Sequence, residues 1–231
     1  MKSTTRPVKK KKKTGLSAIS PTYWLIGIVA VMVALALIVL VGLPAAATNT
    51  AKATGNSLGD ATAPVTLEVY ADFQCPICGQ FDRGTLKQIE DKYVKTGKVR
   101  IVFNHFAFIG ADTNGDKSES IRAAEASECA NAQGKFWEYA DTLFNNQSGE
   151  NQGAFSDANL EKFAQQVGLD MTQYKTCMDQ DTYLGRVHSS TQNGTQRGVD
   201  STPTVFVNGQ MVRGAISLAS FESIAGTLLR Q

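Results

Sequence analysis

Apolar residues along this chain recur with two periods, and their order predicts an α/β fold. Residues 65–70 (VTLEVY) and 98–106 (KVRIVFNHF) are rich in β-branched and aromatic side chains, which favours two strands. Between them, apolar side chains recur at helical spacing from Phe81 to Tyr93, and Gly97 suits a C-cap. A strand, a helix and a second strand in this order predict a parallel pair with a crossover helix.

A block of about 80 residues then shows no strand pattern. Apolar residues in it recur at helical spacing in successive stretches, at 118–130, 135–144, 156–167, 170–178 and 181–196. A compact domain rarely contains an unstructured loop of this length. The pattern therefore predicts a helical insertion over about 107–197.

Strand character returns after the insertion and is followed by one more helix. Asn208-Gly209 lies between two apolar runs in 199–212, which is the strongest short-range signal for a β-hairpin. Ser217 suits the N-cap of a C-terminal helix with apolar residues at helical spacing. The folded domain, predicted over residues 59–231, thus has the order β-α-β, helical insertion, β-hairpin, α.

The N-terminal part of the chain has a different composition. Residues 23–43 carry no charge and are rich in Val, Leu, Ile and Ala; as a helix they would span about 31 Å, close to the thickness of a bilayer core. Seven cations and no acid in residues 1–14 predict that residues 1–22 are a basic cytoplasmic tail. We therefore expect a single-pass cell-membrane protein whose folded domain lies outside the cytoplasm, after a flexible linker of small and polar residues at 44–58.

A cleaved signal peptide is the alternative to this anchor, because Pro44-Ala45-Ala46-Ala47 offers small residues for cleavage. The apolar stretch is longer than the usual apolar region of a signal peptide, about 7–15 residues, which favours the anchor. Beyond residue 14 the chain holds 16 cations against 21 acids. A mildly acidic domain repels phosphates, so nucleic-acid binding is not expected.

Two cysteines with two residues between them, Cys75 and Cys78, follow the first predicted strand and open the helix. A helix N-terminus stabilises a thiolate on the first cysteine, and the second lies within reach to resolve a mixed disulfide. Pro76 suits the first helical position, where its missing N–H costs nothing. Half of a zinc site is the other interpretation, but zinc needs four ligands and the remaining cysteines stand alone. The pattern favours dithiol redox chemistry, and neither a metal nor a cofactor is expected.

Pro203 and the pair Cys129 and Cys177 each have a purely structural interpretation and a more specific one. A proline just before a strand is usually an edge or turn residue, but in this context we expect a cis bond at Thr202-Pro203 that packs against the active-site cysteines and exposes the Thr202 backbone to a substrate strand. Cys129 and Cys177 are either buried free thiols or, as an oxidising compartment favours, a structural disulfide.

Two acids precede the cysteines, Glu68 and Asp72. A buried carboxylate below a CxxC pair can accept a proton when the second thiol reacts. Strand alternation puts Glu68 on the opposite face from Val69, so Glu68 is not placed under the cysteines. For both acids a strand-edge or turn charge stays the alternative, and His105 and His188 are expected to be surface or hydrogen-bonded core residues.

The segment at 72–78 (DFQCPIC), the helical insertion and the segment at 201–209 (STPTVFVNG) together resemble the DsbA-like branch of the thioredoxin superfamily, over roughly residues 59–230. The resemblance implies a thioredoxin-like fold with an inserted helical subdomain. It implies transfer of a disulfide to reduced exported proteins and reoxidation by a membrane partner that is DsbB-like or vitamin K epoxide reductase-like. It also implies a nucleophilic Cys75, a resolving Cys78, and supporting roles for Pro76, Ile77, Thr202 and Pro203.

Two positions depart from that pattern. Members of the branch often carry a buried Glu six residues before the first cysteine, where this chain has Val69, and the best-known oxidases have His where it has Ile77. Both departures bear on the strength of the oxidant. A reductase for exported cysteines, for instance in cytochrome maturation, therefore stays open as an alternative. A tethered copper-binding module, with Cys75 and Cys78 as soft ligands, is another, although the absence of Met or His around the CxxC pair argues against it.

Overall fold

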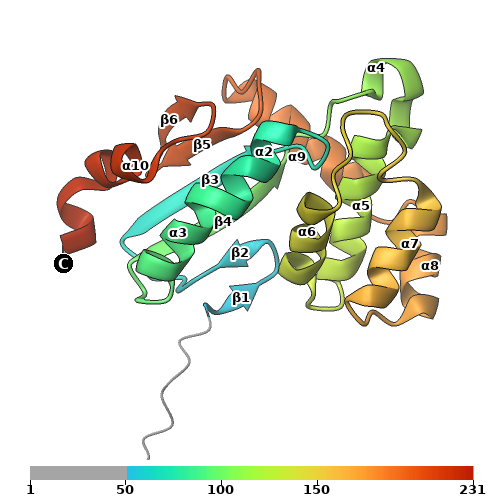
Figure 1. Ribbon diagram of the computed structural model, residues 1–231, viewed down its shortest axis with the longest axis horizontal. Coiled ribbons are helices and arrows are strands. Elements are labelled where there is room, and N and C mark those ends of the chain that lie inside the picture. Colours follow the sequence, from blue (N-terminus) through green and yellow to red (C-terminus); the bar gives the residue numbers. More distant parts are fainter. Residues whose placement is uncertain (1–50, 231) are drawn as a thin grey trace, which may run out of the picture. The chain divides into compact units, whose positions relative to one another are not determined.

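The computed structural model describes residues 51–230, and its centre is a six-stranded mixed sheet with the strand order β1-β2-β4-β3-β5-β6 (Figure 1). β3 and β4 lie parallel in the middle of the sheet, and the other neighbouring pairs are antiparallel. The strands are β1 (Ala53–Thr54), β2 (Ser57–Leu58), β3 (Val65–Ala71), β4 (Val99–His105), β5 (Thr204–Val207) and β6 (Gln210–Arg213).

The sheet begins earlier in the chain than composition predicts. Residues 44–58 are predicted to be a flexible linker, but β1 and β2 form a hairpin within that range and β2 pairs with β4. Gly55 turns the hairpin with a φ of +59°, and the Asn56 side chain donates a hydrogen bond to the Phe103 carbonyl at 2.6 Å. The prediction is wrong for residues 53–58, because strand pairing uses backbone groups that small polar side chains do not reveal.

One continuous helical segment joins β3 to β4 and lies across one face of the sheet (Figure 1). The register pairs Val65 with Val99 and Ala71 with His105, which confirms the predicted parallel β-α-β unit. The segment contains two π-helical turns, η1 and η2, between and after its α-helical turns. Its parts are α2 (Pro76–Phe81), η1 (Asp82–Leu86), α3 (Lys87–Ile89) and η2 (Glu90–Val94).

The predicted helical insertion follows β4 and precedes β5 along the chain (Figure 1). Ser118 caps its α5 helix by accepting from the Ile121 N–H at 3.4 Å. The expected disulfide is present: Cys129 of α5 is joined to Cys177 of α8, with their Cα atoms 5.9 Å apart. The helices are α4 (Ala111–Asn114), η3 (Gly115–Lys117), α5 (Glu119–Asn131), α6 (Phe136–Asn145), α7 (Asp157–Gln166), α8 (Met171–Asp179) and α9 (Leu184–Gln196).

The two faces of the sheet carry separate apolar clusters. The main core includes the inward side chains of β3, namely Val65, Leu67, Val69 and Ala71, together with the buried side chains of the α2–η2 segment. On the other face, Tyr70 packs with a smaller cluster, and Gly194 of α9 lies so close that a Cβ there would come within 2.9 Å of the Tyr70 ring. The face of β3 that carries Glu68 and Tyr70 is therefore covered by α9, not by the helix that begins at the cysteines.

The chain ends in a hairpin and a helix, as the sequence predicts. Asn208 and Gly209 turn from β5 to β6 with φ values of +48° and +84°. Ser217 caps α10 (Leu218–Ala225), which is followed by the 3-10 turn η4 (Gly226–Arg230). No helix within residues 51–230 is long and apolar enough to cross a bilayer. The tail predicted at 1–22 and the membrane helix predicted at 23–43 lie outside the described residues.

Candidate active site

Cys75 is the N-cap residue of α2. Its backbone is extended, with φ −67° and ψ 117°, and Pro76 opens the helix as predicted. The Cys75 sulfur accepts a hydrogen bond from the backbone N–H of Cys78 at 3.4 Å, in the position that a hydroxyl or carboxylate oxygen usually takes at a helix start. Both cysteines are free thiols and both are buried, with Cys75 6% and Cys78 2% exposed. Cys75 is thus the more accessible of the two sulfurs.

The two thiols differ strongly in acidity. A hydrogen bond from the Cys78 thiol lowers the pKa of Cys75 to about 6; burial acts in the other direction, and the Thr202 hydroxyl and the N–H groups of Cys78 and Ile77 lower the pKa further. Burial raises the pKa of Cys78 far above its ordinary value, and the neighbouring Cys75 adds to the rise. At neutral pH, Cys75 is a thiolate while Cys78 keeps its proton.

The Thr202–Pro203 peptide bond is cis, as expected. It immediately precedes β5, the antiparallel neighbour of β3, so this loop lies beside the start of α2. The Cys75 sulfur lies 3.4 Å from the Thr202 carbonyl oxygen, across a sequence separation of 127 residues, and donates to it when the thiol is protonated. Pro203 is buried and Thr202 is partly exposed. The fold therefore brings together the two motifs that the sequence singles out.

Asp72 is buried at the end of β3, with 1% of its surface exposed. Its Oδ1 accepts from Ser120 Oγ at 2.6 Å and from the Gln74 N–H at 2.9 Å, and its Oδ2 accepts from the N–H groups of Phe108 and Ile109 at 3.0 and 3.1 Å. Burial raises the pKa of Asp72, and these hydrogen bonds act against that rise. Asp72 thus fastens the segment before Cys75 to the loop after β4 and to α5. A role in proton transfer stays a prediction.

Two glutamines that sequence analysis does not single out also hold this segment. Gln74 Oε1 accepts from the N–H of Asn151 at 2.6 Å. Gln147 Nε2 donates to the carbonyls of Phe73 at 2.7 Å and Cys75 at 2.9 Å. Gln147 and Asn151 belong to the loop between α6 and α7, more than 70 residues away in sequence. Such contacts leave no signal in a single sequence, because a polar loop residue looks the same whether or not it has a distant partner.

Glu68 lies on the far side of β3 from the cysteines. Its carboxylate forms a bidentate ion pair with Arg197, at 2.6 and 3.0 Å, and Arg197 also donates to Tyr70 Oη at 2.9 Å. The guanidinium lies over the Phe206 ring, 4.0 Å from its centroid. Glu68 therefore belongs to the cluster under α9, as strand alternation indicates, and Val69 is the β3 side chain that enters the main core.

The two histidines lie in different surroundings. His105 is 3% exposed, and its Nε2 lies 3.0 Å from Glu128 Oε1 of α5. His188 is on the surface, with Nε2 2.8 Å from Asp116 Oδ1. These positions fit the expected hydrogen-bonded core residue and surface residue.

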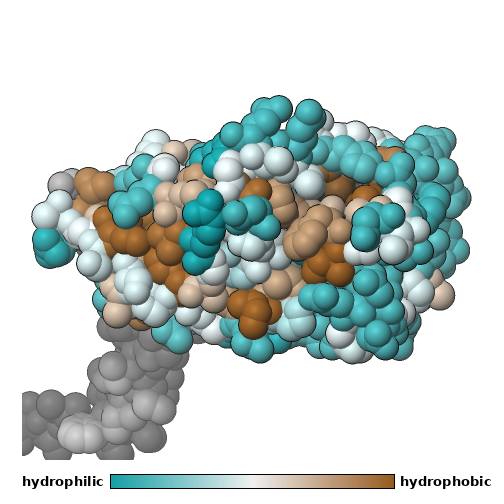
Figure 2. Space-filling view, turned by 90° about the horizontal axis from the view of Figure 1, so that it is seen from above, coloured by the Kyte–Doolittle hydropathy of each residue, from teal (hydrophilic) through white to brown (hydrophobic). Residues whose placement is uncertain are grey.

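Exposed apolar side chains lie in the first turn of α2 and in the loop after β4. Among residues 51–230, the large hydrophobic side chains that are exposed are Ile77, 46% exposed between the cysteines, and Phe108, 43% exposed in the loop that donates to Asp72. Figure 2 looks onto the molecule from above Figure 1 and shows several apolar patches, separated and flanked by hydrophilic surface. An apolar surface of this kind suits contact with unfolded polypeptide.

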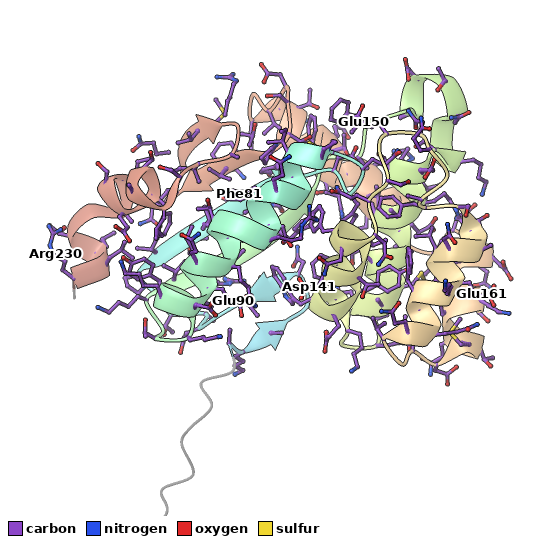
Figure 3. The ribbon with its side chains drawn as sticks, in the orientation of Figure 1. Phe81, Glu90, Asp141, Glu150, Glu161 and Arg230 are labelled. Atoms are coloured by element: carbon purple, nitrogen blue, oxygen red, sulfur yellow. A yellow bond between two sulfur atoms is a disulfide. The ribbon has the colours of Figure 1, made fainter. Side chains whose placement is uncertain are left out.

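A cavity of about 240 Å³ lies farther along the same helical segment, between η1 and α6. Figure 3 labels two of its carboxylates, Glu90 of η2 and Asp141 of α6. Burial raises the pKa of a third, Asp82, to about 7, and Asp141 adds to that rise. The cysteines do not line this cavity, so it is separate from the dithiol site.

Comparison with known proteins agrees with this geometry. A family model described as Thioredoxin matches residues 51–225. The probable disulfide bond formation protein D of Bacillus cereus is 28% identical over 165 residues, which cover 70% of this chain and 73% of that protein. BdbD from Bacillus subtilis, solved in its oxidised form, has a TM-score of 0.68 at 23% identity, and the match covers 77% of this chain and 94% of that chain.

A second kind of relative carries the domain as part of a longer protein. The Na(+)/H(+) antiporter NhaA 3 of Salinispora tropica is 31% identical over 177 residues, which cover 74% of this chain. The match spans only about a quarter of that antiporter's length, 25%. The shared part is therefore the domain described above. Because the family model matches most of the chain, this chain belongs to the thioredoxin family.

Proposed function

We propose that this protein oxidises cysteine pairs in exported proteins by transferring a disulfide from Cys75–Cys78. Within its family, the protein is a DsbA-like thiol–disulfide oxidoreductase. The observation that carries the proposal is the contrast between the two thiols at the start of α2, where the pKa of Cys75 is lowered to about 6 and that of Cys78 is raised. This contrast supports Cys75 as the sulfur that is attacked and released, and Cys78 as the resolving thiol.

The proposed reaction begins with the oxidised Cys75–Cys78 pair. A substrate thiolate attacks the Cys75 sulfur, the bond between the two enzyme sulfurs breaks, and Cys78 takes up a proton. A second substrate thiolate then attacks the substrate sulfur of the mixed disulfide, and Cys75 leaves as a thiolate. The substrate gains a disulfide and the enzyme is left with a dithiol. A pKa of about 6 favours the last step, because a thiol of lower pKa leaves faster.

The residues around the sulfurs have supporting roles in this proposal. Pro76 starts α2, and the Thr202 carbonyl, which lies 3.4 Å from the Cys75 sulfur, offers backbone for pairing with an extended substrate segment before Pro203. Ile77 provides exposed apolar surface beside the reacting sulfur. Unfolded substrates expose both unpaired backbone and apolar side chains, so such a surface would accept many sequences.

The proposed location is outside the cytoplasm, with a single membrane helix at 23–43 as the anchor. DsbA-like proteins act on exported substrates and are reoxidised by a partner, and we propose a membrane protein that is DsbB-like or vitamin K epoxide reductase-like for that role. The name of the Bacillus cereus relative, a probable disulfide bond formation protein, supports oxidation as the direction of the reaction.

The test is the equilibrium reduction potential of Cys75–Cys78 in the purified protein, measured against glutathione. A double substitution, Cys129→Ser with Cys177→Ser, serves as the control that assigns the signal to the right pair. A potential well above about −200 mV is expected for an oxidant, whereas a value near or below about −270 mV would make the protein a reductase. The reductase is the second candidate because Ile77, unlike a polar residue, gives the Cys75 thiolate no side-chain donor. Metal analysis of the same sample tests the copper-binding alternative.

A further inference from the structure

Gln147 spans the gap between the helical insertion and the active-site segment. Its side-chain Nε2 donates both hydrogens to backbone carbonyls of that segment, to Phe73 at 2.7 Å and to Cys75 at 2.9 Å. The Cys75 carbonyl is also the acceptor of the helical hydrogen bond from the Gly79 N–H at 3.2 Å. One amide therefore holds the residue that carries the reactive sulfur and the residue two positions before it.

Gly79 leaves the space that Gln147 occupies. A Cβ built on Gly79 would come within 2.1 Å of Gln147 Oε1 and 2.9 Å of Arg83 Nη1. Gln147 donates from the helical insertion to the active-site segment, whereas Arg83 of η1 donates from that segment to the insertion, to the Phe144 carbonyl near the end of α6. Gly79 lies within a helix, where alanine is normally favoured over glycine, so its presence needs a packing reason. The Gln147 side chain provides that reason.

We propose that Gln147 is a positioning residue, which holds the Phe73 and Cys75 carbonyls so that the first turn of α2 keeps Cys75 in its reactive orientation, and that Gly79 lacks a side chain to admit it. The proposal rests on the proposed function only in that Cys75 is the reacting sulfur. It makes the helical insertion a part of the dithiol site rather than a cover over it, because the orientation of Cys75 then depends on the loop between α6 and α7.

Gln147 affects the Cys75 thiolate through the backbone geometry at the N-cap of α2. The thiolate is stabilised by the Cys78 N–H, which lies 3.4 Å from the Cys75 sulfur and depends on the backbone dihedrals of Cys75. If the Cys75 carbonyl loses its second donor, the first turn of α2 gains freedom and that hydrogen bond weakens. The loss of about one hydrogen bond to a charged group corresponds to a rise of about one unit in the pKa of Cys75.

The test compares four variants of the full chain in the reduced state. Gln147→Met removes both donors without adding charge or shortening the side chain much. Gly79→Ala leaves Gln147 intact but fills its space. Gln147→Ala empties that space, and the fourth variant combines Gly79→Ala with Gln147→Ala. Gln152→Met is the matched control, because Gln152 is exposed in the same loop and donates only to the Glu150 carbonyl. The pKa of Cys75 is read from thiolate absorbance against pH, and urea unfolding shows that each variant is folded.

We expect Gln147→Met and Gly79→Ala each to raise the pKa of Cys75 by about one unit. Release of Cys75 from a mixed disulfide with a dithiol peptide should slow about threefold, because a thiol of higher pKa leaves more slowly. This figure gives the leaving thiol a Brønsted coefficient of the same size as that of the attacking thiol, about 0.4–0.5. When Gln147 is already replaced by Ala, Gly79→Ala should not raise the pKa of Cys75 any further, because the two substitutions act on the same contact.

A folded Gln147→Met variant with the wild-type pKa of Cys75 overturns the proposal, and so do additive effects of Gly79→Ala and Gln147→Ala. If Gly79→Ala prevents folding, Gln147→Met decides the matter alone. Failure of the proposed function is a separate result, in which wild-type protein titrates near pH 6 but does not oxidise the peptide. In that case the pKa comparison still supports or overturns the role of Gln147.

Discussion

Replacing Cys75 by Ser tests whether the thiolate stabilises the reduced protein. The pKa of Cys75 is lowered from an ordinary 9.0 to about 6 in the folded state. A group with a depressed pKa stabilises the folded state above its unfolded pKa, and this stabilisation is lost as the pH falls through the folded pKa. The free energy of unfolding of the reduced protein should therefore contain a part that grows from pH 6 towards pH 9, and Ser, which does not ionise, removes it.

The size of this part follows from the two pKa values. Linkage gives a contribution near zero at pH 5, about 1 kcal/mol at pH 7 and about 3 kcal/mol at pH 8. The range stops at pH 8 because the unfolded Cys78 thiol begins to ionise above it. Since Cys75 is only 6% exposed, solvent screening reduces these values little.

The assay is urea unfolding of wild-type protein and Cys75→Ser, both kept reduced, at pH 5, 7 and 8. The difference in the free energy of unfolding between the two proteins should widen by about 3 kcal/mol across this range. Any constant offset reports the packing difference between sulfur and oxygen and is of no consequence here. A difference that stays flat from pH 5 to pH 8 would refute the depressed pKa and, with it, the assignment of Cys75 as the better leaving group.

Three further variants separate the roles of other groups in the structure. Removing the disulfide by Cys129→Ala with Cys177→Ala should lower the free energy of unfolding by about 4 kcal/mol for a loop of 48 residues, measured by urea unfolding; a loss under about 1 kcal/mol would contradict the chain-entropy reasoning. Asp72→Asn places an amide among four donors and should lower the free energy of unfolding by about 1–3 kcal/mol in the same assay; an unchanged stability would contradict the role of Asp72 in fastening this segment. Glu68→Gln weakens a half-buried ion pair with Arg197 and should cost about 1 kcal/mol or less. It should leave the pH dependence of thiolate absorbance unchanged, and a shift there would mean that Glu68 acts through the sheet on the cysteines.

Much of the site could be predicted from sequence because its key residues are fixed by local rules. Cys75 has to be an N-cap residue once a strand ends before it and Pro76 follows it. The turn at Asn208-Gly209 follows local backbone preferences, and it pairs β5 with β6. Strand alternation was enough to separate Glu68 from Val69.

The remainder depends on contacts between distant residues. Asp72 is a plain turn acid in the sequence, and its partners Ser120, Phe108 and Ile109 lie 36 to 48 residues away. The same holds for Gln147, whose loop has the composition of an ordinary polar surface. The predicted linker extends too far along the chain for a different reason. The hairpin at residues 53–58 is held by backbone hydrogen bonds, which tolerate almost any side chain.

The lengths of the outer strands have a consequence for how this protein avoids aggregation. β1 has two residues and β6 has four, with exposed Gln210 and Arg213 at the ends of β6. An edge strand offers unpaired backbone groups to any other chain, and short or charged edges limit such pairing. A protein that handles unfolded chains would meet many partners able to add a strand. In the proposed function, the short edges would leave the backbone at Thr202, beside the Cys75 sulfur, as the place where an extended substrate segment pairs and is released after the reaction, instead of accumulating on the sheet.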